Sequence, residues 1–148
     1  MITIEIEAGQ AFPLGLLERA ARAVLDLSGS PDADLTLVLT NDDRIQALNR
    51  DFLHHDAPTD VLAFPAEEEN PETGRRYLGD VVISLPRALE QSGERGHAVE
   101  AEVQLLVVHG ILHLLGHDHA GEQEKAAMWK AQIEILGSLG VSPQIVHE

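Results

Sequence analysis

The sequence contains no cysteine among its 148 residues. Disulfide bonds and thiolate metal sites are therefore excluded, and the absence of cysteine is consistent with a reducing compartment such as the cytoplasm. Basic residues are also scarce, because 10 lysines and arginines stand against 25 acidic residues and the net charge is −15. This balance argues against a broad basic surface that binds nucleic acid through its phosphates. Any binding of nucleic acid must be local or assisted by a partner.

Long hydrophobic segments are absent as well. The most apolar run, residues 103–115, contains Gln104, His109 and His113 and is too short to cross a bilayer. The first ten residues show no basic segment followed by an apolar stretch, so we expect no signal peptide. The chain length suits one domain, and an apolar content of 44% suits a globular protein. We therefore expect a single cytoplasmic domain, residues 1–148, that does not associate with membranes.

Alternating and helical apolar patterns divide the chain into strands and helices. Strands are predicted at residues 2–6, 35–40, 61–64 and 77–85, and helices at residues 13–27, 41–52, 86–91, 99–115 and 122–136. Pro65 limits the third strand and favours an edge position for it, and the acidic stretch 66–74 is predicted as a loop. Gly93 and Gly96 are expected to break the short third helix. This order predicts an α+β domain in which helices pack on a small, mixed, four-stranded sheet.

Three histidines at the end of the main predicted helix have the spacing of metal ligands. His109 and His113 are one turn apart on one helix face, among apolar residues. Gly116 follows, and glycine readily takes the left-handed conformation in which helices end, so the next turn can bring back His119. Three such imidazoles leave a fourth position for water, the pattern of catalytic zinc sites. The alternative is that these histidines only pack or face solvent, and their combined offsets favour the metal site.

The same offsets occur in the metzincin proteases, whose motif reads HExxHxxGxxH. The glutamate of that motif is their general base, and Gly110 stands at its position in this chain. The metal-binding histidines are therefore present, whereas the base of the ordinary protease mechanism is missing.

The stretch His109–His119, HGILHLLGHDH, resembles the signature HGxLHLxGxDH of the YbeY family of bacterial metal-dependent endoribonucleases. Two further stretches agree with that family in order and separation, PTDVLAFP at residues 58–65 and LGDVVIS at residues 78–84. The resemblance implies a zinc ion, or another divalent transition metal, held by the three histidines. It also implies a single-strand-specific endoribonuclease that acts in 16S rRNA 3′-end maturation and ribosome quality control. The expected partners are ribosomal RNA and small-subunit ribosomal proteins, and no DNA.

Carboxylates near these motifs are candidates for supporting roles. Asp118, beside His119, would accept the second N–H of a ligating imidazole, or it would satisfy backbone groups of the turn. Asp80 would orient a ligand or a water molecule, or it would form a local hydrogen bond. Thr59 and Asp60 are implied by the resemblance to line the active-site cleft. The sequence does not identify the catalytic base.

One departure from the family concerns its basic residues. The family usually reads YRGKDKPTD where this chain reads FLHHDAPTD, at residues 52–60. Leu53 therefore stands at the position of a functionally important arginine, and both lysines are replaced. Five residues are candidates to supply the missing positive charge: Arg50, Arg75, Arg76 and protonated His54 or His55.

Two other classes of function remain as alternatives. A metal-dependent hydrolase of another substrate, including peptides, would use the same histidines, although Gly110 argues against the protease mechanism. A non-catalytic zinc-binding ribosome assembly factor would use the histidine site for stability, and its acidic surface would meet basic ribosomal proteins. The charge of −15 and the missing arginine favour this last class.

Overall fold

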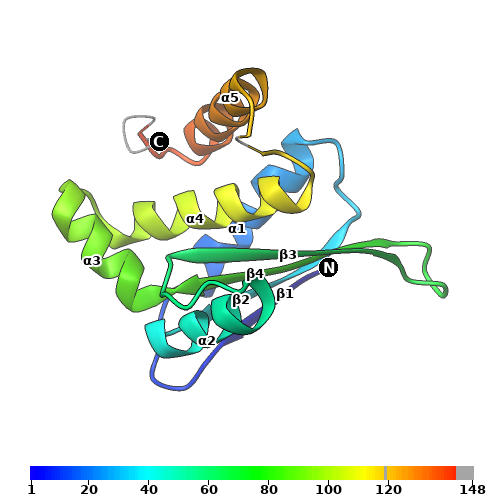
Figure 1. Ribbon diagram of the computed structural model, residues 1–148. Helices are drawn as coiled ribbons and strands as arrows, with labels where there is room; N and C mark the ends of the chain where they lie inside the picture. Colours follow the sequence, from blue (N-terminus) through cyan, green and yellow to red (C-terminus); the bar gives the residue numbers. More distant parts are fainter. Residues whose placement is uncertain (119, 143–148) are drawn as a thin grey trace.

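The structure is a computed structural model that describes residues 1–118 and 120–142, and for Glu67 the backbone alone (Figure 1). In chain order its elements are β1 (Ile2–Ile6), α1 (Leu14–Leu27), β2 (Asp34–Thr40), α2 (Asp42–Leu53), β3 (Val61–Glu69), β4 (Arg76–Ser84), α3 (Leu85–Arg95), α4 (Val99–Leu114) and α5 (Glu122–Ser138). The described residues form a single small α+β domain, which confirms the predicted fold class. Over these residues no helix is long and apolar enough to cross a membrane.

The four strands form one mixed sheet in the order β1–β2–β4–β3. The first three of these are parallel, and β3 runs antiparallel to β4. Helices α1 and α4 cover one face of the sheet, with α5 outside them, and α2 lies on the other face (Figure 1). Most of β4 is therefore buried on both faces, whereas buried and half-buried residues alternate along β2, because α2 packs on β3 and β4.

Two hydrophobic clusters join these layers. The larger cluster lies between the sheet and helices α1, α4 and α5, and it includes Val81 and Ile111. The smaller cluster lies under α2 and consists of Ile45, Leu62 and Val82. Val81 and Val82 are neighbours in β4 but belong to different clusters, because successive side chains of a strand point to opposite faces. The sheet therefore separates two distinct sides of the molecule.

The third strand is longer than the sequence predicted. β3 continues through Pro65 to Glu69, so part of the predicted acidic loop is strand. β3 is an edge strand, as predicted, and the register shift between Pro65 and Glu68 accommodates the proline there. Gly79 pairs with Pro65, and a Cβ on Gly79 would lie 2.1 Å from the carbonyl oxygen of Phe64. The two strands approach this closely only because residue 79 is glycine.

The third helix is also longer than predicted. α3 continues through Gly93 to Arg95 and ends where Gly96 takes a φ of +73°. A glycine inside a helix costs only about 1 kcal/mol, and α3 is held in place by the burial of Ala88 and Ser92. The prediction that Gly93 breaks the helix is therefore wrong. The extra turn places Arg95 beside α4.

Candidate metal centre and adjoining cavity

Helix α4 positions the candidate site. Every residue from Glu102 to Leu114 is buried except His109 and His113, which are partly exposed. A helix that is apolar on nearly all sides belongs in the interior of a domain. The two histidines therefore reach the surface from a rigid, closely packed element.

The ring nitrogens of the two histidines converge. Their Nε2 atoms lie 3.2 Å apart, and the rings meet edge to face with centroids 4.7 Å apart. In a tetrahedral zinc site with Zn–N distances of about 2.0–2.1 Å, two ligand nitrogens lie about 3.3 Å apart. The separation of the Nε2 atoms of His109 and His113 therefore fits two ligands of one ion.

Gln132 of α5 determines which nitrogen of His109 carries the hydrogen. The side-chain oxygen of Gln132 accepts a hydrogen bond from Nδ1 of His109, with a distance of 2.9 Å. An amide oxygen only accepts, so the lone pair of His109 is on Nε2, the atom that faces His113. Sequence reasoning missed this residue. The available signal was a glutamine on the inward face of α5, in line with the buried Met128 and Leu136.

α4 ends just before Gly116, which terminates the helix as the sequence predicted. The φ of Gly116 is +99°. Its amide donates to the carbonyl of His113, and the amide of His117 donates to the carbonyl of Leu112, each over 3.0 Å. These two bonds form a Schellman motif, in which glycine is the preferred residue. The chain therefore turns directly after the histidine pair.

The third predicted ligand, His119, lies outside the described residues. Among residues 1–118 and 120–142, no three His, Cys, Asp or Glu side chains form a group that could hold a metal ion. Asp118 is exposed in the turn after α4. The three-histidine site and the supporting role of Asp118 therefore stay predictions.

Gly110 has a packing role that explains the missing protease base. A Cβ on Gly110 would lie 2.5 Å from Cγ1 of Val81 and 3.3 Å from Cγ2 of Val61. Both valines belong to the sheet, so α4 rests directly on β3 and β4 at this point. No side chain fits there without moving the helix, and a glutamate cannot occupy the position as it does in the metzincins.

A cavity of about 240 Å³ adjoins His109. Its lining residues are Asp60, Val61, Arg95, Glu102, Leu105, Leu106, His109 and Gln132. These residues come from the start of β3 and from α3, α4 and α5, which are distant in the sequence. Of the two residues that the resemblance implied in the cleft, Asp60 lines this cavity together with His109 and Thr59 does not, and Arg95 and Glu102 were not anticipated.

Glu102 is a buried charge in the wall of this cavity, with no exposed surface. Nη1 of Arg95 lies 3.2 and 3.0 Å from its two carboxylate oxygens, and Nε2 of His97 lies 2.7 Å from Oε1. A buried carboxylate is tolerated when it is paired and hydrogen-bonded in this way. Glu102 therefore holds the guanidinium of Arg95 against α4. The signal in the sequence was a glutamate inside an otherwise apolar helix.

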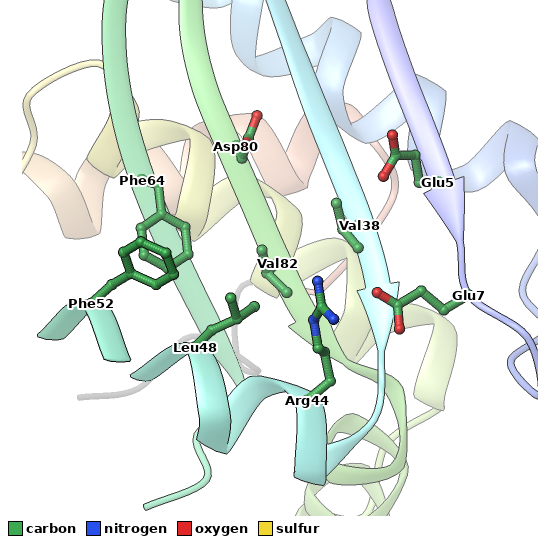
Figure 2. A pocket seen from close by; sticks show the side chains of 9 residues that line it. All are labelled: Glu5, Glu7, Val38, Arg44, Leu48, Phe52, Phe64, Asp80 and Val82. Atoms are coloured by element: carbon green, nitrogen blue, oxygen red, sulfur yellow. The ribbon is translucent and has the colours of Figure 1, made fainter. Parts of the chain in front are cut away.

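A second hollow, of about 500 Å³, lies on the opposite face of the sheet (Figure 2). It is lined by Glu5, Glu7, Val38, Arg44, Leu48, Phe52, Phe64, Asp80 and Val82. Figure 2 shows the aromatic rings on one side, from α2 and β3, and Glu5 of β1 on the other side, together with Glu7, which directly follows β1. The sheet separates this hollow from the histidines.

Asp80 belongs to that second hollow and not to the histidine site. The hydroxyl of Tyr77 donates to Asp80, and Oγ1 of Thr36 lies 2.7 Å from the same hydroxyl. Burial, followed by the hydrogen bond to Asp80, raises the pKa of Tyr77. Of the two roles considered for Asp80, the structure supports local hydrogen bonding.

The candidates for the missing family cation near α2 lie apart from the cavity lining. Leu53 is exposed at the end of α2, and His54 and His55 are exposed directly after it. Arg50 is also on α2, where its Nε lies 3.0 Å from a carboxylate oxygen of Asp51. Because α2 covers the other face of the sheet, Arg50 does not share the cavity of His109.

Arg75 and Arg76 lie at the far end of the β3–β4 hairpin. Arg76 begins β4, and roughly 16 Å of strand separates it from Val81, at about 3.3 Å per residue. Val81 is the residue that contacts α4 at Gly110. Neither arginine lines the cavity beside the histidines.

These features define an α+β domain with a histidine pair on a central helix, a glycine turn and a small adjoining cavity. The family model for the endoribonuclease YbeY matches residues 5–140. A relative of that name from Pelotomaculum thermopropionicum is 47% identical over 132 residues, 86% of this chain and 87% of the relative. A Geobacillus kaustophilus relative is 40% identical, over 95% of this chain and 93% of its own. This chain belongs to the endoribonuclease YbeY family.

A solved structure has the same fold. The solution structure of a Thermotoga maritima protein matches 100% of this chain and 97% of its own, with a TM-score of 0.62 and 28% identity. By family the protein is thus an endoribonuclease, a hydrolase that acts on RNA.

Proposed function

We propose that this protein is a metal-dependent endoribonuclease that cleaves single-stranded ribosomal RNA in the cytoplasm. Its task would be 16S rRNA 3′-end maturation and ribosome quality control. The observation that carries the metal dependence is the 3.2 Å separation between the Nε2 atoms of His109 and His113, which suits two ligands of one ion. His119 would be the third ligand, and an all-nitrogen set favours zinc over magnesium or calcium.

The residues of the chain prepare this site. When bound, the ion supplies Lewis acidity towards a phosphate oxygen and a water of lowered pKa. Gln132 keeps the hydrogen of His109 on Nδ1, so that Nε2 stays available as a neutral ligand nitrogen. The buried side chains of Leu112 and Leu114 exclude water from the helix side of the histidines. The cavity beside His109 would receive part of the RNA chain.

The acidic composition determines how RNA would be bound. With a net charge of −15, extended contact with phosphates is unfavourable. Binding would instead rely on local contacts at the cleft and on small-subunit ribosomal proteins, whose basic surfaces complement an acidic partner. We therefore propose ribosomal RNA and these proteins as partners.

Incubation of the metal-loaded protein with a structured RNA and with casein tests this function. We expect cleavage of the RNA in its single-stranded segments and no cleavage of casein. His113→Ala should abolish RNA cleavage and lower the metal content measured by elemental analysis. His147→Ala, at a histidine without ligand spacing in the sequence, should change neither. An undiminished metal content in His113→Ala would refute the assignment of ligands.

The net charge of −15 favours one second candidate, a non-catalytic assembly factor that docks on basic ribosomal proteins. In that case the metal-loaded protein would cleave neither substrate but would still cosediment with small ribosomal subunits. Cleavage of casein would instead identify a hydrolase of another substrate. Such a peptidase would need a base from elsewhere, because Gly110 is packed against the sheet.

A further inference from the structure

The cavity beside His109 presents hydrogen-bond donors that are held in place. Arg95 binds the fully buried Glu102 through Nη1, while 35% of the arginine side chain stays exposed. A guanidinium has five N–H donors in one plane, so this bond leaves further donors and a flat surface. The orientation of Arg95 is therefore fixed before any ligand arrives.

Asp60 provides acceptors in the same cavity. Its backbone carbonyl accepts from the amide of Ser84 over 2.9 Å, which holds the residue directly before β3. Within the part of the chain that the structure describes, its Oδ1 atom receives only a long contact, 3.4 Å, from the hydroxyl of Thr59. An ionised carboxylate offers about four acceptor positions. The side chain of Asp60 therefore has the capacity to accept hydrogen bonds from a ligand.

The charges in the cavity disfavour a phosphate. Two carboxylates, those of Asp60 and Glu102, stand against one guanidinium, which Glu102 already pairs. A phosphate of the RNA would therefore bind at the proposed ion on His109, and not between Asp60 and Glu102, where the negative charge is in excess. A neutral planar group with both donors and acceptors suits the cavity better. Val61, Leu105 and Leu106 add the apolar walls that such a group requires.

We propose that this cavity binds the nucleobase next to the scissile phosphate, and that it selects bases with an exocyclic amino group over uracil. The inference rests on the proposed ribonuclease function, because His109 is both a proposed metal ligand and part of the cavity wall. Asp60 accepts from the amino group, and Arg95 donates to a ring acceptor or stacks on the base. Uracil has carbonyl oxygens on both sides of its one N–H, and these face the carboxylate unfavourably. Single-stranded RNA offers its bases in the unstacked form that such a cavity needs.

Binding of cytidine and uridine to the metal-loaded protein tests this subsite without RNA cleavage. The two nucleosides differ in whether the ring carries an amino group or a carbonyl oxygen. Chemical shifts of the backbone amides would be followed during each titration. We expect saturable shifts at Asp60 and along α4, with cytidine bound about tenfold more tightly than uridine. This comparison in the unchanged protein needs no variant.

Two variants locate the preference. Asp60→Asn replaces an acceptor oxygen by an amide donor of the same size and should reduce the difference between the nucleosides to about twofold or less. Asp56→Asn removes the same charge from the same loop, at an exposed residue outside the cavity. It should keep the tenfold preference.

Several results would overturn the inference. These are equal affinities for the two nucleosides, shifts that lie away from the cavity, and an Asp60→Asn protein that keeps the preference. Single-turnover cleavage of oligocytidylate and oligouridylate adds a further criterion. Equal loss of both rates in Asp60→Asn, with nucleoside preference retained, would make Asp60 a group that acts in catalysis instead. Failure of the parent protein to cleave any RNA, while it still prefers cytidine, would refute the proposed function and not the base preference.

Discussion

Replacement of Gly110 by alanine would test how closely α4 is fitted to the sheet, and hence how His109 and His113 are placed. The added Cβ would lie 2.5 Å from Cγ1 and 3.2 Å from Cγ2 of Val81, and 3.3 Å from Cγ2 of Val61. Favourable contact between carbon atoms requires about 3.5–4.0 Å. Val81 is fully buried, and a β-branched side chain has little freedom to rotate away. The helix and the sheet must therefore separate.

Two opposing effects set the size of the change. Overpacking of a core costs about 1–3 kcal/mol, whereas alanine is a better helix former than glycine by about 1 kcal/mol. Because the closest contact is to a stiff, buried side chain, the overpacking term should dominate. We expect the free energy of unfolding to fall by up to about 2 kcal/mol, the difference between the two effects, which lowers Tm by up to roughly 8 °C for a domain of this size.

Urea denaturation monitored by circular dichroism measures this loss. The double variant Gly110→Ala/Val81→Ala removes the colliding methyl groups of Val81. The substitution Gly110→Ala should therefore lower the free energy of unfolding less in the Val81→Ala background than in the parent, and the coupling energy between the two substitutions should be about 0.5–3 kcal/mol. Gly137→Ala is the matched control, because a Cβ on this helical glycine has no atom of residues 1–118 or 120–142 within 4 Å. It should not destabilise the protein. The packing argument fails if Gly110→Ala is as stable as the parent, or if its cost is the same with and without Val81.

Two further predictions concern the turn after α4 and the outer face of the sheet. Gly116→Val should lower the free energy of unfolding by about 1–2 kcal/mol and reduce the metal content. A φ of +99° strains a β-branched residue, although no atom of the described residues lies within 4 Å of the added Cβ. Gly116→Asn should cost less, and equal stability of all three proteins in urea would contradict the backbone argument. Tyr77 is the single tyrosine, and its pKa is raised above 10.0 by burial and by its hydrogen bond to Asp80. The stabilisation of the fold that accompanies this raised pKa is therefore complete below pH 10.0 and is lost as the pH rises through the raised pKa. Ultraviolet titration should show this raised midpoint, and Asp80→Asn should lower it; a midpoint at or below that of free tyrosine would disprove the assignment.

The features that sequence reasoning predicted correctly are those that depend on local geometry. Two histidines four residues apart meet on one face of any helix, and His109 and His113 do so here. Glycine is the residue that ends a helix in a left-handed turn, and Gly116 does so. The edge position of β3 followed in the same way from Pro65, which lacks a backbone donor.

Features that arise from contacts between distant segments could not be predicted from the sequence. The sequence does not distinguish Gln132 from the other polar residues of α5, because its hydrogen bond to His109 depends on how α5 packs. Arg95 reached the cavity because α3 continues past Gly93, which local propensity disfavours and packing allows. Glu102 holds that arginine from inside α4.

Gly110 shows the physical reason for this division. The absence of a carboxylate at position 110, directly after His109, was visible in the sequence, since residue 110 is glycine. Why it must be glycine follows from the 2.5 Å that a Cβ would leave to Val81, a residue 29 positions earlier in the chain. Periodicity and propensity describe how each segment folds, but the distance between two packed segments is set by the side chains of both. The histidine pair was therefore readable from one stretch, and the cavity that adjoins it arose only when four segments met.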